Sequence, residues 1–500
     1  MPSFYIYDIS FLIVFSLFVG IFLYIRRHNL KREGIMYLYR TKVGIRFIDY
    51  VGKKYKKTLT VLGFIGVIIG YLLMLSMIYF LYKLVYIYLF APEVVRQIKI
   101  PPLIPLIPYL PEVFKVSFLP PFYFTYWIIS IAVIAIFHEF AHGIIAKRYN
   151  VPILTTGFGF LGPFLAAFVE PDEKIMMKKP KYQQIAILSA GVFTNFVLAI
   201  VFFLVLSIFF IVSYVPAGAI FNTYTPGIIE VGSISMIGGK AVEIADKKNI
   251  LELINKDNLT DDLVLGNENQ INFTKIISNN KTYYTNINNF KEQLEKASLS
   301  SKDDETRKIV VYEDLPAINT GLRGTIIKIN GNEVKDYNDL VDIMKNFKPG
   351  EKIKIITKYK TDKTKEEFLE YNLVLAEDSD KTGRAIMGIG LIDFKGRILG
   401  KITDFFNFFK KPGTDYEPRF NAELIIFIYN LIWWLALINL SVALVNMWPV
   451  AIFDGGRMFF LTILAITKSE RYAKAAFAFM TYLILGSLLL LMVGWFVAIF

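Results

Sequence analysis

The sequence predicts a polytopic α-helical membrane protein with about six transmembrane helices, re-entrant elements and an extracytoplasmic α+β region inserted between the core helices. Three observations support this fold class. Hydrophobic residues make up 54% of the chain, and its mean hydropathy of +0.46 lies well above that of ordinary soluble domains. Long apolar runs occupy both terminal parts of the chain. Between residues 215 and 420 the sequence is instead polar, charged and rich in turn residues.

Apolar runs define the predicted spans and the domain boundaries. Each run is long enough to cross a bilayer as a helix: residues 6–25, 58–90, 122–146, 184–214, 422–446 and 474–499. We therefore divide the chain into an N-terminal membrane hairpin with a proline-rich external segment (1–121), the first part of a membrane core (122–214), an extracytoplasmic region (215–420) and the second part of the core (421–500).

Positive charge is concentrated beside the spans. Residues 26–57 contain 11 Lys and Arg residues but only two acids, Glu33 and Asp49. The positive-inside rule places this segment in the cytoplasm of a multi-pass protein, for which we expect the cell membrane. A nucleic-acid surface is the competing explanation of the net charge of +12, but a basic loop joining two spans needs no such partner. The absence of cysteine excludes disulfides and thiolate metal ligands.

A glycine-rich apolar segment follows the third span. Residues 153–169, "ILTTGFGFLGPFLAAFV", are interrupted by three glycines and a proline, which favours a re-entrant or sheet-forming loop over a helix.

The polar region contains an internal repeat. "GSISMIGGKAV" (232–242) and "GTIIKINGNEV" (324–334) share glycine, isoleucine and valine positions at an offset of 92. In the second copy, "PAINTGLRGTIIKING" resembles the PDZ domain, which captures peptide chain ends by strand addition. We place this module at about 310–395. The first copy is weaker, since either "ADKKNILELI" or "NINNFKEQLEKA" could supply its helix, so one or two modules are compatible with the sequence.

The third span contains the sequence "HEFAH" at residues 138–142. On a helix His138 and His142, four residues apart, lie on one face and can bind one zinc ion, while Glu139 is placed to accept a proton from water. Ionisable groups at bilayer depth are costly and usually have a task. The competing interpretation is two structural histidines that bond neighbouring helices, which buries both without a charged partner. His28, in the basic segment, is expected to be an ordinary solvated residue.

A zinc ion of this kind needs a third protein ligand and an open position. With no cysteine and no further histidine in a span, a carboxylate is expected. Asp454 follows a helix break at the depth predicted for the two histidines, although Asp before Gly-Gly is also an ordinary turn or cap. Glu170, just after the glycine-rich segment, is the alternative ligand.

Three motifs together resemble the site-2 protease family of intramembrane zinc metalloproteases: "FHEFAHG", "SAGVFTN" and "NMWPVAIFDGG". The resemblance implies that Asp454 is the third Zn²⁺ ligand, that Glu139 is the catalytic base, and that Asn195, Asn446 and Pro449 line the active site. A simple interhelical hydrogen bond is the alternative role for Asn195.

The resemblance implies an intramembrane zinc endopeptidase that cleaves transmembrane segments of membrane proteins in regulated intramembrane proteolysis. Its expected partners are the lipid bilayer and transmembrane protein substrates already trimmed by another protease, with no nucleic acid. The active site is expected near the cytoplasmic side and the PDZ-like region outside. Two alternatives remain: an HExxH protease acting on soluble or prenylated peptides, and an ion-binding transporter or receptor without proteolytic activity.

Overall fold

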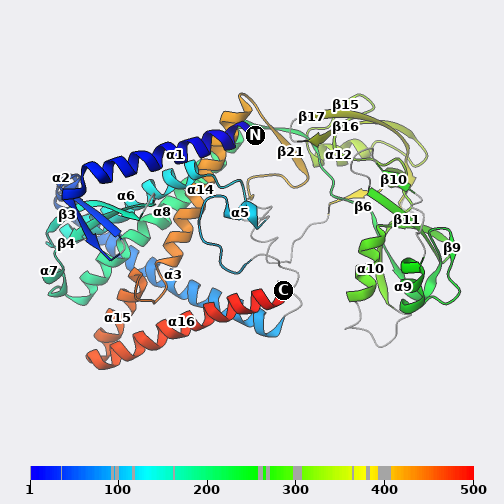
Figure 1. The fold of residues 1–500 in the computed structure, drawn as a ribbon. Helices are drawn as coiled ribbons and strands as arrows, with labels where there is room; N and C mark the ends of the chain where they lie inside the picture. The colour runs from blue at the N-terminus through cyan, green and yellow to red at the C-terminus, as the bar shows by residue number, and fades with distance from the viewer. Residues whose placement is uncertain are drawn as a thin grey trace. The chain divides into compact units, whose positions relative to one another are not determined.

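The computed structural model describes residues 2–34, 36–91, 95, 101–114, 119–161, 164–256, 263–265, 271–296, 307–362, 365–378, 383–391 and 407–499. The chain forms two compact units, one comprising Met1–Ser213 with Phe420–Phe500 and the other Tyr214–Arg419 (Figure 1). We call the first the membrane unit and the second the polar unit, and each is described by itself.

Long apolar helices build the membrane unit. Among the described residues, six helices are long and apolar enough to cross a membrane, which confirms the predicted polytopic fold. They are α1 (Pro2–Ile25), α3 (Lys56–Phe90), α6 (Phe124–Arg148), α8 (Lys181–Ser213), α14 (Ala422–Val445) and α16 (Glu470–Ile499). Helix α8 is central, because α3, α6 and α14 all pack against it. The shorter helices of this unit are η1 (Arg27–Asn29), α2 (Ile45–Lys54), α5 (Leu110–Val113), α7 (Glu173–Met177) and α15 (Asp454–Thr467).

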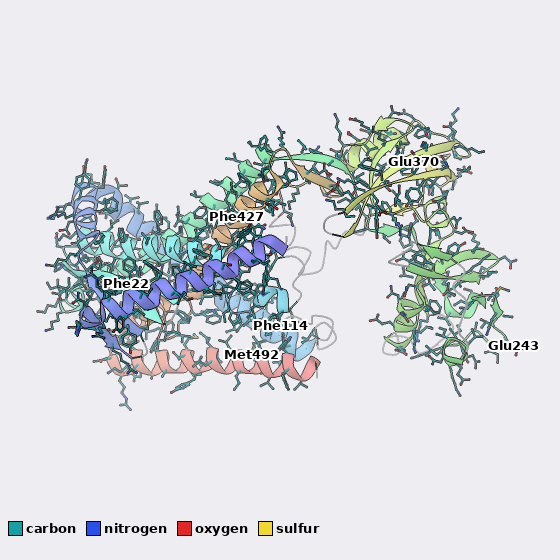
Figure 2. The ribbon with its side chains drawn as sticks, turned by 45° about the horizontal axis from the view of Figure 1, so that its top comes forward. Phe22, Phe114, Glu243, Glu370, Phe427 and Met492 are labelled. Atoms are coloured by element: carbon teal, nitrogen blue, oxygen red, sulfur yellow. The ribbon has the colours of Figure 1, made fainter. Side chains whose placement is uncertain are left out.

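An antiparallel sheet lies beside these helices, with strand order β1-β2-β3-β4. The glycine-rich segment forms β3 (Ile153–Leu161) and β4 (Phe164–Pro171), as a sheet-forming loop should. The basic segment was expected to be a loop, but it supplies β1 (Leu30–Glu33) and β2 (Met36–Thr41). Gly157 permits this pairing, because a Cβ there would lie 2.2 Å from the Tyr39 carbonyl oxygen on β2. Phe22 lies on α1 (Figure 2), and the centre of its ring is 5.3 Å from that of Tyr39 on β2, so this contact joins α1 to the sheet.

A carboxylate from α1 caps the first turn of α6. Asp8 is 1% exposed, and its oxygens accept hydrogen bonds from the backbone N–H groups of Phe124 (2.9 Å) and Thr125 (2.8 Å). The hydroxyls of Thr125 and Tyr109 donate to the same carboxylate. Tyr123, the residue at the N-cap position of α6, makes no side-chain cap. Asp8 therefore supplies from another helix the acceptor that a helix start requires.

The two larger sheets of the polar unit share part of their topology. The first has order β7-β13-β12-β11-β8-β9 and the second β17-β16-β14-β5-β21, with β15 paired to β14. In both, a short hairpin leads into a helix and then into a longer hairpin: β8, β9, α9, β11 and β12 correspond to β14, β15, α12, β16 and β17. The repeat at an offset of 92 therefore extends from sequence to topology. Its helix in the first copy is α9, which contains "KKNILELI".

Buried aliphatic side chains hold each copy together. In the first copy the core includes Ile237, Ile250 and Ile276, and in the second Ile329, Leu340 and Ile355. The elements of the polar unit are β5 (Tyr214–Ala219), β6 (Thr223–Tyr224), β7 (Pro226–Glu230), η2 (Val231–Ser233), β8 (Ile234–Ile237), β9 (Lys240–Ala241), α9 (Lys247–Lys256), β10 (Leu263–Leu265), β11 (Ile271–Ser278), β12 (Lys281–Thr285), α10 (Ile287–Lys296), β13 (Lys308–Glu313), α11 (Pro316–Asn319), β14 (Thr325–Ile329), β15 (Asn332–Glu333), α12 (Tyr337–Met344), β16 (Lys352–Asp362), β17 (Lys365–Val374), β18 (Ala376–Glu377), β19 (Ala385–Ile386), β20 (Ile389–Gly390) and β21 (Thr414–Pro418).

Candidate metal centre

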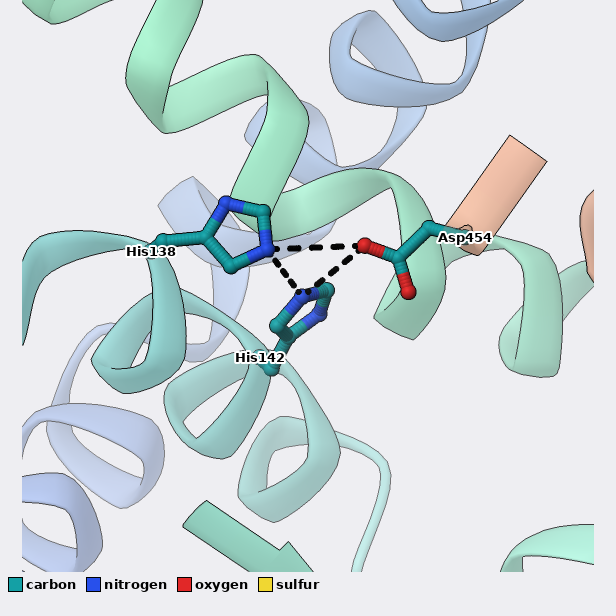
Figure 3. Close-up of side chains that lie close together, drawn as sticks. All are labelled: His138, His142 and Asp454. Carbon is teal, nitrogen blue, oxygen red and sulfur yellow. Dashed lines mark hydrogen bonds and ion pairs between the residues drawn. The ribbon is translucent and has the colours of Figure 1, made fainter. Parts of the chain in front are cut away.

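Two histidines of α6 point toward the same space. His138 and His142 are one helical turn apart, and their Nε2 atoms are 3.0 Å apart (Figure 3). The His142 side chain is 12% exposed and that of His138 11%, so both imidazoles lie inside the membrane unit. The predicted i, i+4 geometry is therefore present.

Asp454 reaches the histidines because the chain turns back sharply after α14. The N–H of Gly455 donates to the carbonyl oxygen of Asn446 at 2.7 Å, which closes the turn. A Cβ on Gly455 would lie 2.5 Å from the Met447 carbonyl oxygen, and one on Gly456 2.1 Å from that of Val450. Any larger residue would push the turn apart, so both glycines are needed where α15 begins. Asp454 is consequently the first residue of α15, close to both imidazoles.

The three ligand atoms form a triangle with the dimensions of a zinc site. Oδ2 of Asp454 lies 3.3 Å from Nε2 of His142 and 3.5 Å from Nε2 of His138 (Figure 3). Zinc bonds of about 2.0–2.2 Å in tetrahedral geometry separate neighbouring ligand atoms by about 3.3–3.6 Å. Within the described residues, these three side chains are the one group of His, Asp and Glu placed to hold a metal ion. Two nitrogens and one oxygen leave a fourth position open, as in catalytic zinc sites.

Gly191 of α8 keeps space open beside the ligand atoms. A Cβ at this position would lie 2.4 Å from Nε2 of His142 and 2.7 Å from Nε2 of His138. An alanine would thus occupy the space on which the imidazoles converge. The absence of a side chain here fits a site that must hold a further group.

The other ring nitrogens of the histidines are bound by α8. Nδ1 of His142 lies 2.7 Å from the carbonyl oxygen of Ile187, so Nδ1 carries the proton and Nε2 has a lone pair. Nδ2 of Asn195 lies 2.9 Å from Nδ1 of His138, and Oδ1 of Asn195 is buried without a partner among the described residues. A half-turn of this amide brings Oδ1 to His138, gives this buried oxygen a partner, and lets Nδ1 donate to it, so that Nε2 of His138 also has a lone pair for a metal ion.

Glu139 faces the sheet rather than the triangle. Its Oε2 accepts a hydrogen bond of 3.0 Å from the backbone N–H of Val169 on β4. Because β4 is the last strand of the sheet, this bond uses an N–H on its open edge. The carboxylate is therefore held between the histidine turn and the edge of β4.

The profile of peptidase family M50 matches residues 126–491 of the chain. The chain belongs to peptidase family M50. A search of curated proteins finds no match. The family comprises the site-2 proteases, so the protein is a zinc metallopeptidase of the intramembrane type, and its HExxH histidines with Asp454 fit a zinc site.

In this M50 peptidase, Glu170 lies apart from the metal triangle. Its Oε2 accepts hydrogen bonds from Thr155 Oγ1 (2.6 Å) and Arg40 Nε (3.2 Å). The hydrogen bond from Thr155, and to a smaller extent that from Arg40, lowers the pKa of the Glu170 carboxyl below its usual value. The carboxylate thus links β2, β3 and β4. Its position favours Asp454 over Glu170 as the third ligand.

The two remaining predicted residues lie in the turn before Asp454. Asn446 is half-buried and contributes its backbone carbonyl to the turn, and Pro449 is buried within it. Neither belongs to the metal triangle. Asn195 instead contacts a metal-facing histidine directly. The alternative role of Asn195 was an interhelical hydrogen bond. The structure contains this bond, between α8 and α6, and it orients the His138 ring.

Proposed function

We propose that this M50 peptidase is an intramembrane endopeptidase that cleaves transmembrane segments of membrane proteins in regulated intramembrane proteolysis. The observation that carries the proposal is the convergence of His138, His142 and Asp454 inside a unit of membrane-spanning helices. Ionisable side chains inside a bilayer raise the free energy of the folded protein, so such a cluster usually binds a cation or a substrate.

His138, His142 and Asp454 would hold the zinc ion, which would supply a Lewis acid for activation of water and polarisation of the scissile carbonyl. Glu139 takes a proton from the attacking water and transfers it to the nitrogen of the leaving amine as the C–N bond breaks. The Val169 N–H supports this role because it orients the carboxylate without neutralising it. Asn195 and Ile187 fix the imidazoles through their Nδ1 atoms. Asn195→Leu should therefore weaken zinc binding about tenfold to a hundredfold.

The open edge of β4 is the proposed binding position for the unwound substrate. A transmembrane helix satisfies its own backbone hydrogen bonds, so a segment that unwinds for cleavage needs new partners. Alternate residues of an edge strand point N–H and C=O groups outward, and Val169 is one of them. Ala167 and Leu165 are two and four residues before Val169 on β4, so their backbone N–H and C=O groups also point outward and can pair with an added strand. An extended substrate paired with these residues would pass close to Glu139.

The substrates we propose are single-span proteins already trimmed by another protease. The basic segment at residues 26–57 supports a cytoplasmic position for the metal centre and an extracytoplasmic position for the polar unit. We propose that the repeated modules of the polar unit are PDZ-like and exclude bulky ectodomains. Deleting residues 215–395 should then raise cleavage of full-length substrate toward that of trimmed substrate. Unchanged selectivity would count against this gating role.

The proposal is tested by zinc content and cleavage of a model transmembrane substrate in liposomes. We expect Glu139→Gln to retain zinc and lose cleavage, and Asp454→Ala to lose both. Glu470→Gln is the matched control, because Glu470 is exposed and pairs only with the exposed Lys474 among described residues. A wild type that binds zinc but cleaves neither full-length nor trimmed substrates would instead support an ion-binding transporter or receptor.

A further inference from the structure

Helix α2 (Ile45–Lys54) has an outer face that the peptidase chemistry does not use. Its exposed side chains combine cations with aromatic rings. Phe47 and Tyr50 are 54% and 55% exposed, and the Lys54 ammonium lies 4.9 Å from the centre of the Tyr50 ring. We use the term basic face for this surface with its flanks: Lys42, Arg46, Phe47, Tyr50, Lys53, Lys54, Tyr55, Lys56 and Lys57.

The position of α2 in the chain keeps this face at the bilayer surface. Only Tyr55 separates the end of α2 from the start of the spanning helix α3. At the other end, β1 and β2 connect α2 to the spanning helix α1. A helix joined to a span by a single residue stays near the bilayer surface. Aromatic rings beside lysine and arginine are the composition of helices that lie in the headgroup region.

The charge of the face is not neutralised within the protein. Asp49, the only acid of α2, points the other way and pairs with Lys147 of α6 at 2.8 Å. Across the described residues, none of the six cations of the basic face forms an ion pair. Such a cluster next to a spanning helix attracts anionic lipids, with about a fivefold gain in binding for each cation near the surface.

The opposite face of α2 packs directly on the histidine turn of α6. Ile48 is fully buried, and a Cβ on Gly143 would lie 3.1 Å from its Cδ1. Gly143 is the residue after His142. A Cβ on Gly52 would lie 2.8 Å from Cβ of Lys147, so the two helices approach closely over one full turn. Whatever fixes α2 at the membrane surface therefore also supports the turn that carries the metal-facing imidazoles.

We infer that the basic face of α2 binds the headgroups of anionic phospholipids, and that this binding stabilises the histidine turn through Ile48 and the Asp49–Lys147 ion pair. The inference goes beyond the proposed function, because lipid binding does not depend on cleavage. Lipid is the expected ligand because, at the bilayer surface, anionic headgroups are the nearest counter-charges of the basic face.

Lipid contact is measured on the full chain in vesicles of phosphatidylcholine with phosphatidylglycerol. The chain has no cysteine, so Thr58→Cys, at an exposed position in the first turn of α3, gives a single site for a fluorophore. We expect nitroxide-labelled phosphatidylglycerol to quench this fluorophore more strongly than nitroxide-labelled phosphatidylcholine. Equal quenching by the two lipids overturns the inference.

Charge variants show whether the basic face causes the preference. Arg46→Gln/Lys53→Gln/Lys54→Gln should abolish it, with a loss of about fivefold for each removed cation. Lys335→Gln/Lys348→Gln/Lys352→Gln, which removes three exposed cations from the polar unit, should leave it unchanged. A preference that survives in the first variant also overturns the inference. Tight binding of a fluorescent oligonucleotide without a lipid preference would assign the face to nucleic acid instead.

The link to the metal centre has its own readout. We expect phosphatidylglycerol to increase zinc retention against a chelator in the wild type but not in the charge-reduced α2 variant. If quenching is selective but zinc retention is the same in both lipids, the basic face binds anionic lipid and does not stabilise the histidine turn. Neither measurement requires cleavage, so failure of the proposed protease function would be seen separately.

Discussion

Two acidic residues inside the membrane unit, Asp8 and Asp454, have opposite surroundings. Asp8 is 1% exposed and receives four hydrogen bonds from neutral donors. The Asp454 side chain is 20% exposed and faces the Nε2 atoms of two histidines. The first carboxylate is fully satisfied by the fold, whereas the second is not.

The difference lies in what the partners of each carboxylate can donate. Because the Nδ1–H of His142 donates a hydrogen bond to the Ile187 carbonyl oxygen, Nε2 of a neutral His142 presents a lone pair to Asp454. Two lone pairs 3.3 Å apart repel each other unless a proton or a metal cation lies between them. Three such atoms converge here, and a cation satisfies all of them at once. The fold thus supplies Asp8 with its own donors, whereas Asp454 faces two imidazole nitrogens with which it fits a zinc site.

Asp454→Asn should produce the largest effect. The amide keeps the shape of the side chain but removes the negative charge that would bind the cation. Zinc affinity should therefore fall by more than about a hundredfold, because loss of a residue that only orients a ligand already costs about tenfold to a hundredfold. Zinc content after gel filtration and a competition titration with a chelator measure the change. If this variant binds zinc as tightly as the wild type, the third ligand is not Asp454, and Asp454 no longer differs from Asp8 in this respect.

Gly191→Ala should also abolish zinc binding while the helices remain folded. Its Cβ would lie within 2.7 Å of both Nε2 atoms, where a metal ion and its open position must fit. Gly486→Ala is a control of identical chemistry, because no atom lies within 4 Å of a Cβ at that position in α16. Equal zinc contents in the two variants would show that the space beside Gly191 is not part of the site.

Asp8→Asn should reduce stability but leave zinc affinity unchanged. An amide can accept only some of the four hydrogen bonds, so at least one buried donor at the start of α6 loses its acceptor, which costs about 1–3 kcal/mol. Thermal unfolding in detergent, followed by tryptophan fluorescence, and zinc content measure the two properties together. Loss of zinc with unchanged stability would mean that Asp8 acts on the metal centre rather than on the fold.

The candidate metal centre was predictable to the extent that its signals are local. His138 and His142 follow from helical spacing alone, and Asp454 follows from a helix break combined with a family motif. Asp8 carried a signal that sequence reasoning missed, as the single acid in the first apolar run. Its partners come from residues 109 to 125, and no periodicity reveals such distant contacts.

The sheet shows the same limit. Glycines in residues 153–169 indicated strands, but the pairing of β2 with β3 joins residues more than a hundred positions apart. In the basic segment, the aromatic alternation of "MYLYRT" is a strand signal that the positive charge around it obscured. Charge patterning predicted that the segment lies at the membrane surface but did not reveal that it folds against the histidine turn.

The smallest effect is expected for a third carboxylate, Asp336, in the polar unit. It caps α12 by accepting from the Asp339 N–H at 2.9 Å, and Lys411 Nζ lies 2.7 Å away. The Lys411 hydrogen bond, followed by the cap, lowers the pKa of Asp336 below its usual value. A lowered carboxyl pKa stabilises the folded state above the unfolded value of about 4, and this contribution is lost as pH falls through the folded value.

Amide exchange in α12 should therefore be faster at pH 3 than at pH 6 after correction for intrinsic rates. Because Lys411 is half-exposed, its pairing is screened, and Lys411→Gln should reduce protection at pH 6 by about fivefold or less. Lys345→Gln, which removes an exposed ion pair with Asp342 on the same helix, should not alter the pH dependence. If amide exchange in α12 has the same pH dependence in the Lys411 variant and the wild type, the hydrogen bond from the Asp339 N–H is enough to lower the pKa of Asp336. Asp336 would then resemble Asp8, which receives hydrogen bonds only from neutral donors.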